Sequence, residues 1–204
     1  MNLWFFVSVF GPIIILPVHF LSVEHLKLQG RFGKDKGIKI GDILGLISGW
    51  GFFIFWIGIW ISPQPKIAVP IFQNLTFEIL FVNFSINFLF LIPSIVFILF
   101  GAWFGISGVK QTSLKVAEIH RSENIVTTGV YSIVRHPQYL GGLLAHVGVS
   151  FLLSALGSLI VTPVMLSLIF LISWKEEKEL IREFGEAYNV YKKKVPMLIP
   201  KLFQ

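Results

Sequence analysis

Titratable side chains gather in two short segments, one at each end of a long apolar stretch. Arg135, His136 and Tyr139 form the first segment, and Glu176 and Glu177 form the second. A small zwitterion or cation would suit such a set, with its amine on Glu176 and its acid group near Arg135. Arg and His beside a membrane segment are also common as plain interfacial anchors. The chemistry therefore requires that the two segments meet in space.

The apolar stretch between these segments predicts how they meet. Residues 139–174 are too many for one membrane-spanning helix, and small residues interrupt them near the middle. We expect a tight helical hairpin with spans 139–154 and 158–174. Each arm of ~17 residues reaches ~25 Å, which is barely enough to cross the hydrocarbon and return. Both ends of the hairpin then emerge on one membrane side, which brings Glu176 beside His136.

The segment after the hairpin has the pattern of an amphipathic helix. Its apolar residues recur at spacings of one, three and four: Leu180, Ile181, Phe184, Ala187, Tyr188 and Tyr191. Such a helix lies along the membrane or over a pocket. A solvated face with a lipid-facing stripe is the simpler interpretation for most of its carboxylates.

The composition is that of an integral membrane protein. Hydrophobic residues make up 54% of the 204 residues and charged residues only 14%. Further apolar stretches at residues 3–23, 43–61 and 79–105 predict three more spans. We therefore expect an all-α bundle of about five transmembrane helices in a single domain, 1–204, with the amphipathic helix on the cytosolic face. The absence of cysteine excludes disulfides and a thiolate nucleophile, and no histidine pair has ligand spacing, so no metal is expected.

The net charge of +6 follows from topology. If the N-terminus is outside, the inner segments are 24–42, 106–138 and everything after Trp174, and Lys66 is the one Lys or Arg outside them. This bias predicts a cytosolic C-terminus. It also accounts for the positive net charge, so nucleic acid is not expected as a partner. The expected location is the plasma membrane in a prokaryote or the endoplasmic reticulum in a eukaryote.

A second small-residue pattern lies in the second predicted span. Gly41, Gly45 and Gly49 share one helix face because they follow a period of four. Close helix packing is expected there, either within the bundle or between protomers of a homo-oligomer.

The two polar segments together resemble a known family. The motifs are Gly129-Val-Tyr-x3-Arg-His-Pro-x-Tyr-x-Gly141 and Glu176-Glu-x2-Leu-x3-Phe-Gly-x2-Tyr-x2-Tyr191. They resemble the isoprenylcysteine carboxyl methyltransferases and their phospholipid methyltransferase relatives. The resemblance covers about residues 119–200, and the first three spans carry no matching motif.

This resemblance implies a membrane methyltransferase that uses S-adenosylmethionine. The acceptor would be lipid-like or of the prenylcysteine type, with carboxyl methylation favoured and Arg135 as the catalytic residue that orients the nucleophile. Prenylcysteine enzymes have an arginine where this chain has Ile172, so Arg135 or Lys175 would have to substitute. The residues that would bind the cofactor are Ile125, Val126, Tyr131, His136, Pro137, Gln138, Tyr139 and Glu176, the last through the cofactor's amino group.

Two alternatives remain open from the sequence. The first is an NADPH-dependent membrane reductase of the sterol-reductase type, whose C-terminal half looks similar. Those enzymes typically have Arg-Asp before the glutamate and a tryptophan after the glycine, where this chain has Lys175-Glu176 and Tyr188. The second is a non-catalytic membrane subunit. Affinity for S-adenosylmethionine, for NADPH or for neither would separate the three.

Overall fold

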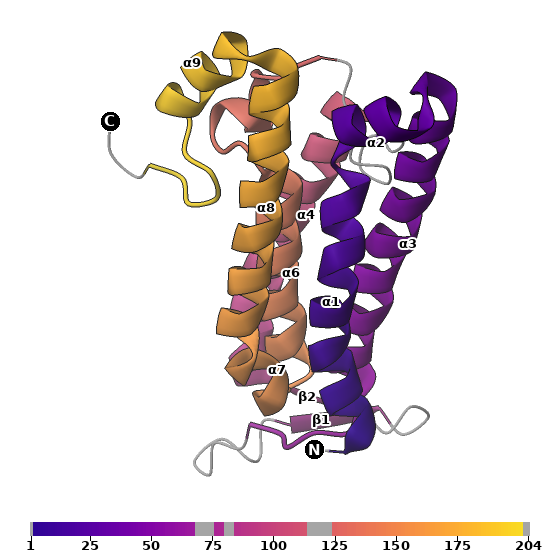
Figure 1. Cartoon of the computed structure of the whole chain (residues 1–204). Helices are drawn as coiled ribbons and strands as arrows, with labels where there is room; N and C mark the ends of the chain where they lie inside the picture. The colour runs from indigo at the N-terminus through magenta and orange to yellow at the C-terminus, as the bar shows by residue number, and fades with distance from the viewer. Residues whose placement is uncertain (1, 68–75, 80–83, 114–123, 202–204) are drawn as a thin grey trace.

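The chain folds as an elongated bundle of long, roughly parallel helices (Figure 1). The computed structural model describes residues 2–67, 76–79, 84–113 and 124–201. The long helices are α1 (Leu3–Ser22), α3 (Lys34–Ile61), α4 (Phe88–Thr112), α6 (Pro137–Leu152) and α8 (Thr162–Phe184). The short helices are α2 (His25–Phe32), η2 (Gly129–Ser132), α7 (Leu156–Ile160) and α9 (Glu186–Lys194). The predicted all-α class is confirmed, with one small hairpin of strands β1 (Thr76–Ile79) and β2 (Phe84–Asn87) as an addition.

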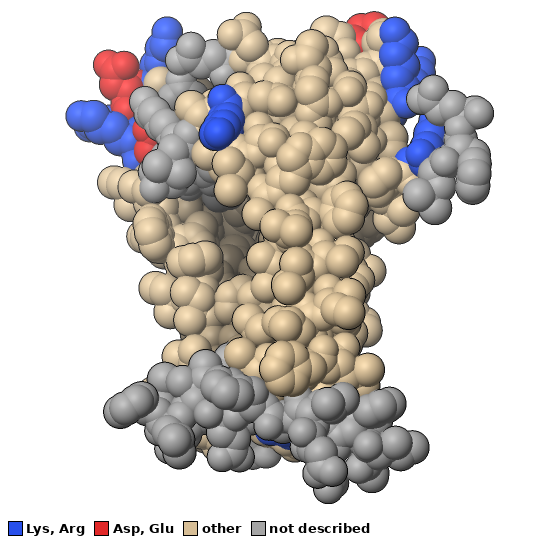
Figure 2. Space-filling model, turned by 180° about the vertical axis from the view of Figure 1, so that it is seen from behind, with Lys and Arg blue, Asp and Glu red and all other residues tan. Residues whose placement is uncertain are grey.

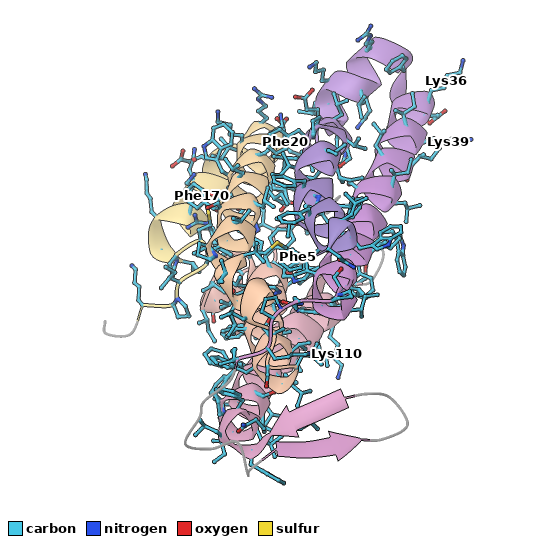
Figure 3. All side chains as sticks on the ribbon, turned by 90° about the horizontal axis from the view of Figure 1, so that it is seen from below. Phe5, Phe20, Lys36, Lys39, Lys110 and Phe170 are labelled. Carbon is cyan, nitrogen blue, oxygen red and sulfur yellow. The ribbon has the colours of Figure 1, made fainter. Side chains whose placement is uncertain are left out.

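The surface of the bundle is that of a membrane protein. By length and composition, α1, α3 and α4 are able to cross a membrane, and large apolar side chains such as Ile14, Ile54 and Ile92 are exposed on them. On the face shown in Figure 2, Lys, Arg, Asp and Glu gather mainly at the end with α2 and α9. Lys36 and Lys39, at the start of α3, extend away from the bundle at that same end (Figure 3).

Glycines let α4 and α6 lie close together. A Cβ atom on Gly101 would lie 2.7 Å from the backbone nitrogen of Ala145, and one on Gly141 would lie 2.5 Å from that of Gly105. Real Cβ atoms do not approach backbone so closely, so any larger residue would push the two helices apart. This contact fixes the start of α6, where the first polar segment lies.

The glycine face of α3 packs inside the chain. Gly41 and Gly45 are buried, and a Cβ on Gly41 would meet the carbonyl oxygen of Ser22 and the side chains of His25 and Leu28 at 3.4–3.5 Å. The packing predicted for this face is thus supplied by α1 and α2. A homo-oligomer through this face stays a prediction with no structural support.

The third predicted span begins too early. Ile79 ends strand β1, and helix α4 begins at Phe88 and continues to Thr112, beyond the predicted end at residue 105. Asn87 marks the start because its side-chain oxygen accepts a hydrogen bond from the backbone N–H of Leu89 at 2.9 Å. Hydropathy alone does not separate an apolar strand from the helix that follows it.

The C-terminal hairpin differs from the prediction in its bounds. Ser154, with a φ of 49°, turns the chain after α6, and α7 precedes the second arm, which begins at Thr162 rather than residue 158. That arm and the first part of the amphipathic segment form one continuous helix, α8. Gly185, with a φ of 58°, ends α8 and separates it from α9.

Candidate active site

A cavity lies at the end of the bundle where α2, η2 and α9 meet the long helices. It brings together all eight residues that the sequence assigned to a cofactor, although they come from the approach to α6, from α6 itself and from α8. These residues are Ile125, Val126, Tyr131, His136, Pro137, Gln138, Tyr139 and Glu176. The hairpin therefore joins the two polar segments as expected, and the binding of a cofactor by them stays a prediction.

Glu176 is held by groups from three parts of the chain. Its Oε1 accepts a hydrogen bond from the Tyr139 hydroxyl and lies 3.2 Å from Nε2 of His19 on α1. Its Oε2 lies 3.5 Å from Nδ1 of His136, whose ring stacks on that of Tyr139 with centroids 5.6 Å apart. The carboxylate is thus fixed in place at the cavity wall, with its side chain 13% exposed.

A second hydrogen-bonded group forms another part of the wall. The side-chain amide of Gln138 donates to the Thr112 hydroxyl at 2.9 Å and to the Tyr131 hydroxyl at 3.1 Å. Burial of Tyr131 raises the pKa of its phenol, so this hydroxyl is neutral at physiological pH. Gly108 leaves room for the group, because a Cβ there would lie 2.8 Å from Gln138 Cγ.

Arg135, the residue predicted to orient the nucleophile, does not line the cavity. Its Nε and Nη2 both lie 2.6 Å from Oε1 of Glu177, which is 1% exposed. Its Nη1 donates to the carbonyl oxygens of Lys192, at 3.1 Å, and of Val195. The guanidinium is therefore fully engaged behind the cavity wall.

The buried carboxylate of Glu177 is strongly stabilised in its charged form. Its other oxygen lies 2.9 Å from the ammonium of Lys192, and His136 Nε2 lies 3.4 Å from Oε1. Burial acts to raise the pKa of Glu177, but hydrogen bonds from His136 and Lys192 and the charge of Arg135 outweigh burial and lower it to about 2. Glu177 is thus part of the support of the site and not of its surface.

The segment after α9 returns to the cavity wall and hydrogen-bonds to the backbone of the residues that precede α6. The N–H groups of Arg135 and His136 donate to the carbonyl oxygens of Pro196, at 2.9 Å, and Met197, at 3.1 Å. Leu198, which follows Met197, is buried. We call residues 195–198 the C-terminal strap, because they fix the backbone from which His136 projects.

The N-terminal part of the chain also reaches the cavity, which the sequence did not predict. Val23 and His25 line it, and Glu24 forms a 2.7 Å ion pair with Lys175 on α8. Glu179 and Glu183 line it as well. One signal was present in the sequence. In the apolar run of residues 2–23 the one titratable side chain is His19, and Glu24 and His25 follow this run directly.

The lining favours a cationic organic ligand with a flat apolar part. The carboxylates of Glu176, Glu179 and Glu183 line the cavity, together with the apolar side chains of Ile125 and Val126. Among the residues that the structure describes, no group of three metal-ligating side chains is found.

Comparison with known proteins finds one matching family and several relatives. Residues 89–187 match the model of the phospholipid methyltransferase family. The chain is 32% identical over 136 residues to the protein-S-isoprenylcysteine O-methyltransferase of Schizosaccharomyces pombe, covering 59% of this chain and 55% of that protein. It is 35% identical over 102 residues to methanethiol S-methyltransferase 2 of Bradyrhizobium diazoefficiens, covering 49% and 38%.

The predicted resemblance to this superfamily of membrane methyltransferases is confirmed. A third relative, the protein-S-isoprenylcysteine O-methyltransferase of Xenopus laevis, is 40% identical over 87 residues, covering 39% of this chain and 28% of that protein. The chain thus spans about half the length of these curated relatives or less. No solved structure matches the chain significantly. The matched range contains all eight predicted cofactor residues, and helices α1 to α3 lie outside it.

Proposed function

We propose that the protein is a membrane methyltransferase that takes its methyl group from S-adenosylmethionine at the cytosolic face and transfers it to a lipophilic acceptor. The observation that carries this proposal is that one cavity is lined by all eight residues assigned from the family motifs. The superfamily resemblance of residues 89–187 supports it.

The chemistry of the lining fits this cofactor. We expect Glu176 to pair with the cofactor's ammonium and the apolar side chains of Ile125 and Val126, which also line the cavity, to contact the adenine. When bound, S-adenosylmethionine supplies a sulfonium-activated methyl group. The residues of this chain bind and orient it and exclude water, so catalysis rests on positioning in a desolvated site. Arg135 acts as a positioning residue, because its guanidinium anchors Glu177 and the strap behind His136.

A carboxylate acceptor, such as a prenylcysteine, is the first candidate for the substrate. It is already ionised at neutral pH and needs no general base. Its charge would have to be met by Arg135 or Lys175, and both are engaged, Arg135 with Glu177 and Lys175 with Glu24 and Glu179.

A lipophilic thiol is the second candidate, and one observation favours it. Ile172, at the position of the arginine in prenylcysteine enzymes, is 5% exposed and packs in the bundle core. A neutral thiol makes no demand for a cation there, and its S–H proton leaves for water as the sulfur takes the methyl group and the cofactor's thioether departs. Methyl transfer from radiolabelled cofactor to N-acetyl-S-farnesylcysteine, compared with transfer to an alkanethiol, distinguishes the two acceptors.

The proposal is tested by titration calorimetry on the purified protein in detergent. S-adenosylmethionine should bind and NADPH should not. Binding of NADPH alone would favour the reductase, and binding of neither would favour the non-catalytic subunit; both results would overturn the proposal.

A further inference from the structure

Helix α1 reaches the candidate cofactor site although it lies outside the range matched to the family. Its His19 is 1% exposed and touches Glu176, and Val23, just after the helix, lines the cavity. The site is therefore not formed by the family-matched part of the chain alone.

His19 is held firmly between three helices. Its ring packs edge-on against Phe52 of α3, with centroids 6.0 Å apart and planes at 79°. Its Nε2 faces Oε1 of Glu176 on α8 at 3.2 Å. The Glu24–Lys175 ion pair, at 2.7 Å, ties the end of α1 to α8 five residues along the chain from His19. These contacts fix the register in which His19 meets Glu176.

We propose that His19 is a positioning residue for the cofactor's amino group. Together with the Tyr139 hydroxyl it holds Oε1 of Glu176 and so fixes the orientation of the carboxylate that would receive the ammonium. A glutamate side chain loses rotamer freedom when it binds a ligand, and contacts that fix it beforehand remove that cost. This inference rests on the proposed function, because it assumes that S-adenosylmethionine occupies the cavity.

The test compares two ligands that differ in the group that Glu176 would bind. S-adenosylmethionine carries the amino acid moiety and a sulfonium, and 5′-methylthioadenosine keeps the nucleoside and an uncharged sulfur but lacks the amino acid and its ammonium. Calorimetry in detergent gives the ratio of the two affinities for the wild type and for His19→Phe, which keeps a ring in the helix interface. We expect the substitution to lower the affinity for S-adenosylmethionine by about tenfold or more, the usual effect of losing a contact to a charged group, and to leave 5′-methylthioadenosine unchanged.

A purely structural role for His19 predicts a different result. Equal weakening of both ligands, or no change in either, would overturn the inference. His19→Gln keeps a side-chain N–H group and should lower the ratio less than His19→Phe. Leu21→Ala, on the exposed side of the same helix, should behave as the wild type.

A double variant supplies a second readout. Because His19 is proposed to act through Glu176, adding His19→Phe to Glu176→Gln should cause little further loss of S-adenosylmethionine affinity. Fully additive losses would contradict the inference even if each single variant is weakened. A wild type that binds neither ligand would instead refute the proposed function itself.

Discussion

Arg135 and Glu177 form a buried ion pair directly behind the cavity, with two guanidinium nitrogens 2.6 Å from one carboxylate oxygen. The adjacent residue, Glu176, faces the cavity instead. Neighbouring positions on an α-helix point about 100° apart, so α8 divides two consecutive glutamates between two roles. One supports the cavity wall from behind, and the other lines the cavity.

The support role of Glu177 makes a prediction about stability. Glu177→Gln removes the negative partner of Arg135 and leaves a buried positive charge, so it should lower the free energy of unfolding by about 3–5 kcal/mol. Denaturant unfolding in detergent measures the change. Glu186→Gln is the matched control, since its side chain is 74% exposed and 4.0 Å from Lys193, and it should have almost no effect. Equal effects of the two substitutions would contradict the support role.

The same carboxylate predicts an acid dependence. The pKa of Glu177 is about 2 in the folded protein and about 4.3 in an unfolded chain. A folded pKa below the unfolded one gives stability that is fully present above about pH 4.3 and is lost as the pH falls towards 2. The stability difference between the wild type and Glu177→Gln should therefore narrow when unfolding is measured at pH 3.5 instead of pH 6. A difference that stays constant over this range would be inconsistent with the lowered pKa.

The cavity role of Glu176 makes a prediction about binding. Glu176→Gln keeps the side-chain size and removes the charge, so the affinity for S-adenosylmethionine should fall by roughly thirtyfold or more, the cost of breaking a partly buried ion pair. Titration calorimetry measures this, again with Glu186→Gln as the control. Glu177→Gln is unsuitable as a control because its contacts support His136. A loss of only severalfold would indicate a carboxylate exposed to water.

The C-terminal strap predicts a truncation effect. A chain ending at Lys194 loses the carbonyl acceptors of the Arg135 and His136 N–H groups, and buried N–H groups without partners are costly. S-adenosylmethionine binding should be abolished while the protein remains inserted in the membrane. A chain ending at Pro200 keeps residues 195–198 and should bind normally. Undiminished affinity after the first truncation would exclude a positioning role for the strap.

Topology is testable with single cysteines because the native chain has none. Lys36 and Pro63 are both exposed and lie near opposite ends of α3. In oriented membranes, an impermeant thiol reagent applied outside should label Pro63→Cys and not Lys36→Cys. Labelling of both from one side would refute the predicted orientation.

Much of the site was predictable because its main residues stand at the two ends of one hairpin. An apolar stretch too long for one span must turn back, and this placed Glu176 beside His136 without knowledge of any other contact. Arg135 shows the limit of that reasoning. Its position in sequence brings it near the site, but the direction of its side chain depends on Glu177 and on the carbonyl of Val195.

Contacts between distant elements were not predictable. His19 lies in an apolar run that gives no sign of which helix it faces, and its contact with Glu176 depends on how α1 packs against α8. Strand β2 was included in the predicted span 79–105 because apolar composition is common to strands and helices. The Gly185 break was missed for a related reason: the apolar spacing continues across it although the backbone does not.

The contact between His19 and Glu176 also constrains how the protein is made. Helix α1 leaves the ribosome early, whereas Glu176 and the strap that supports His136 follow only after three further long helices. The proposed binding site is therefore completed only once residues 195–198 have been made, and shorter nascent chains should not bind S-adenosylmethionine.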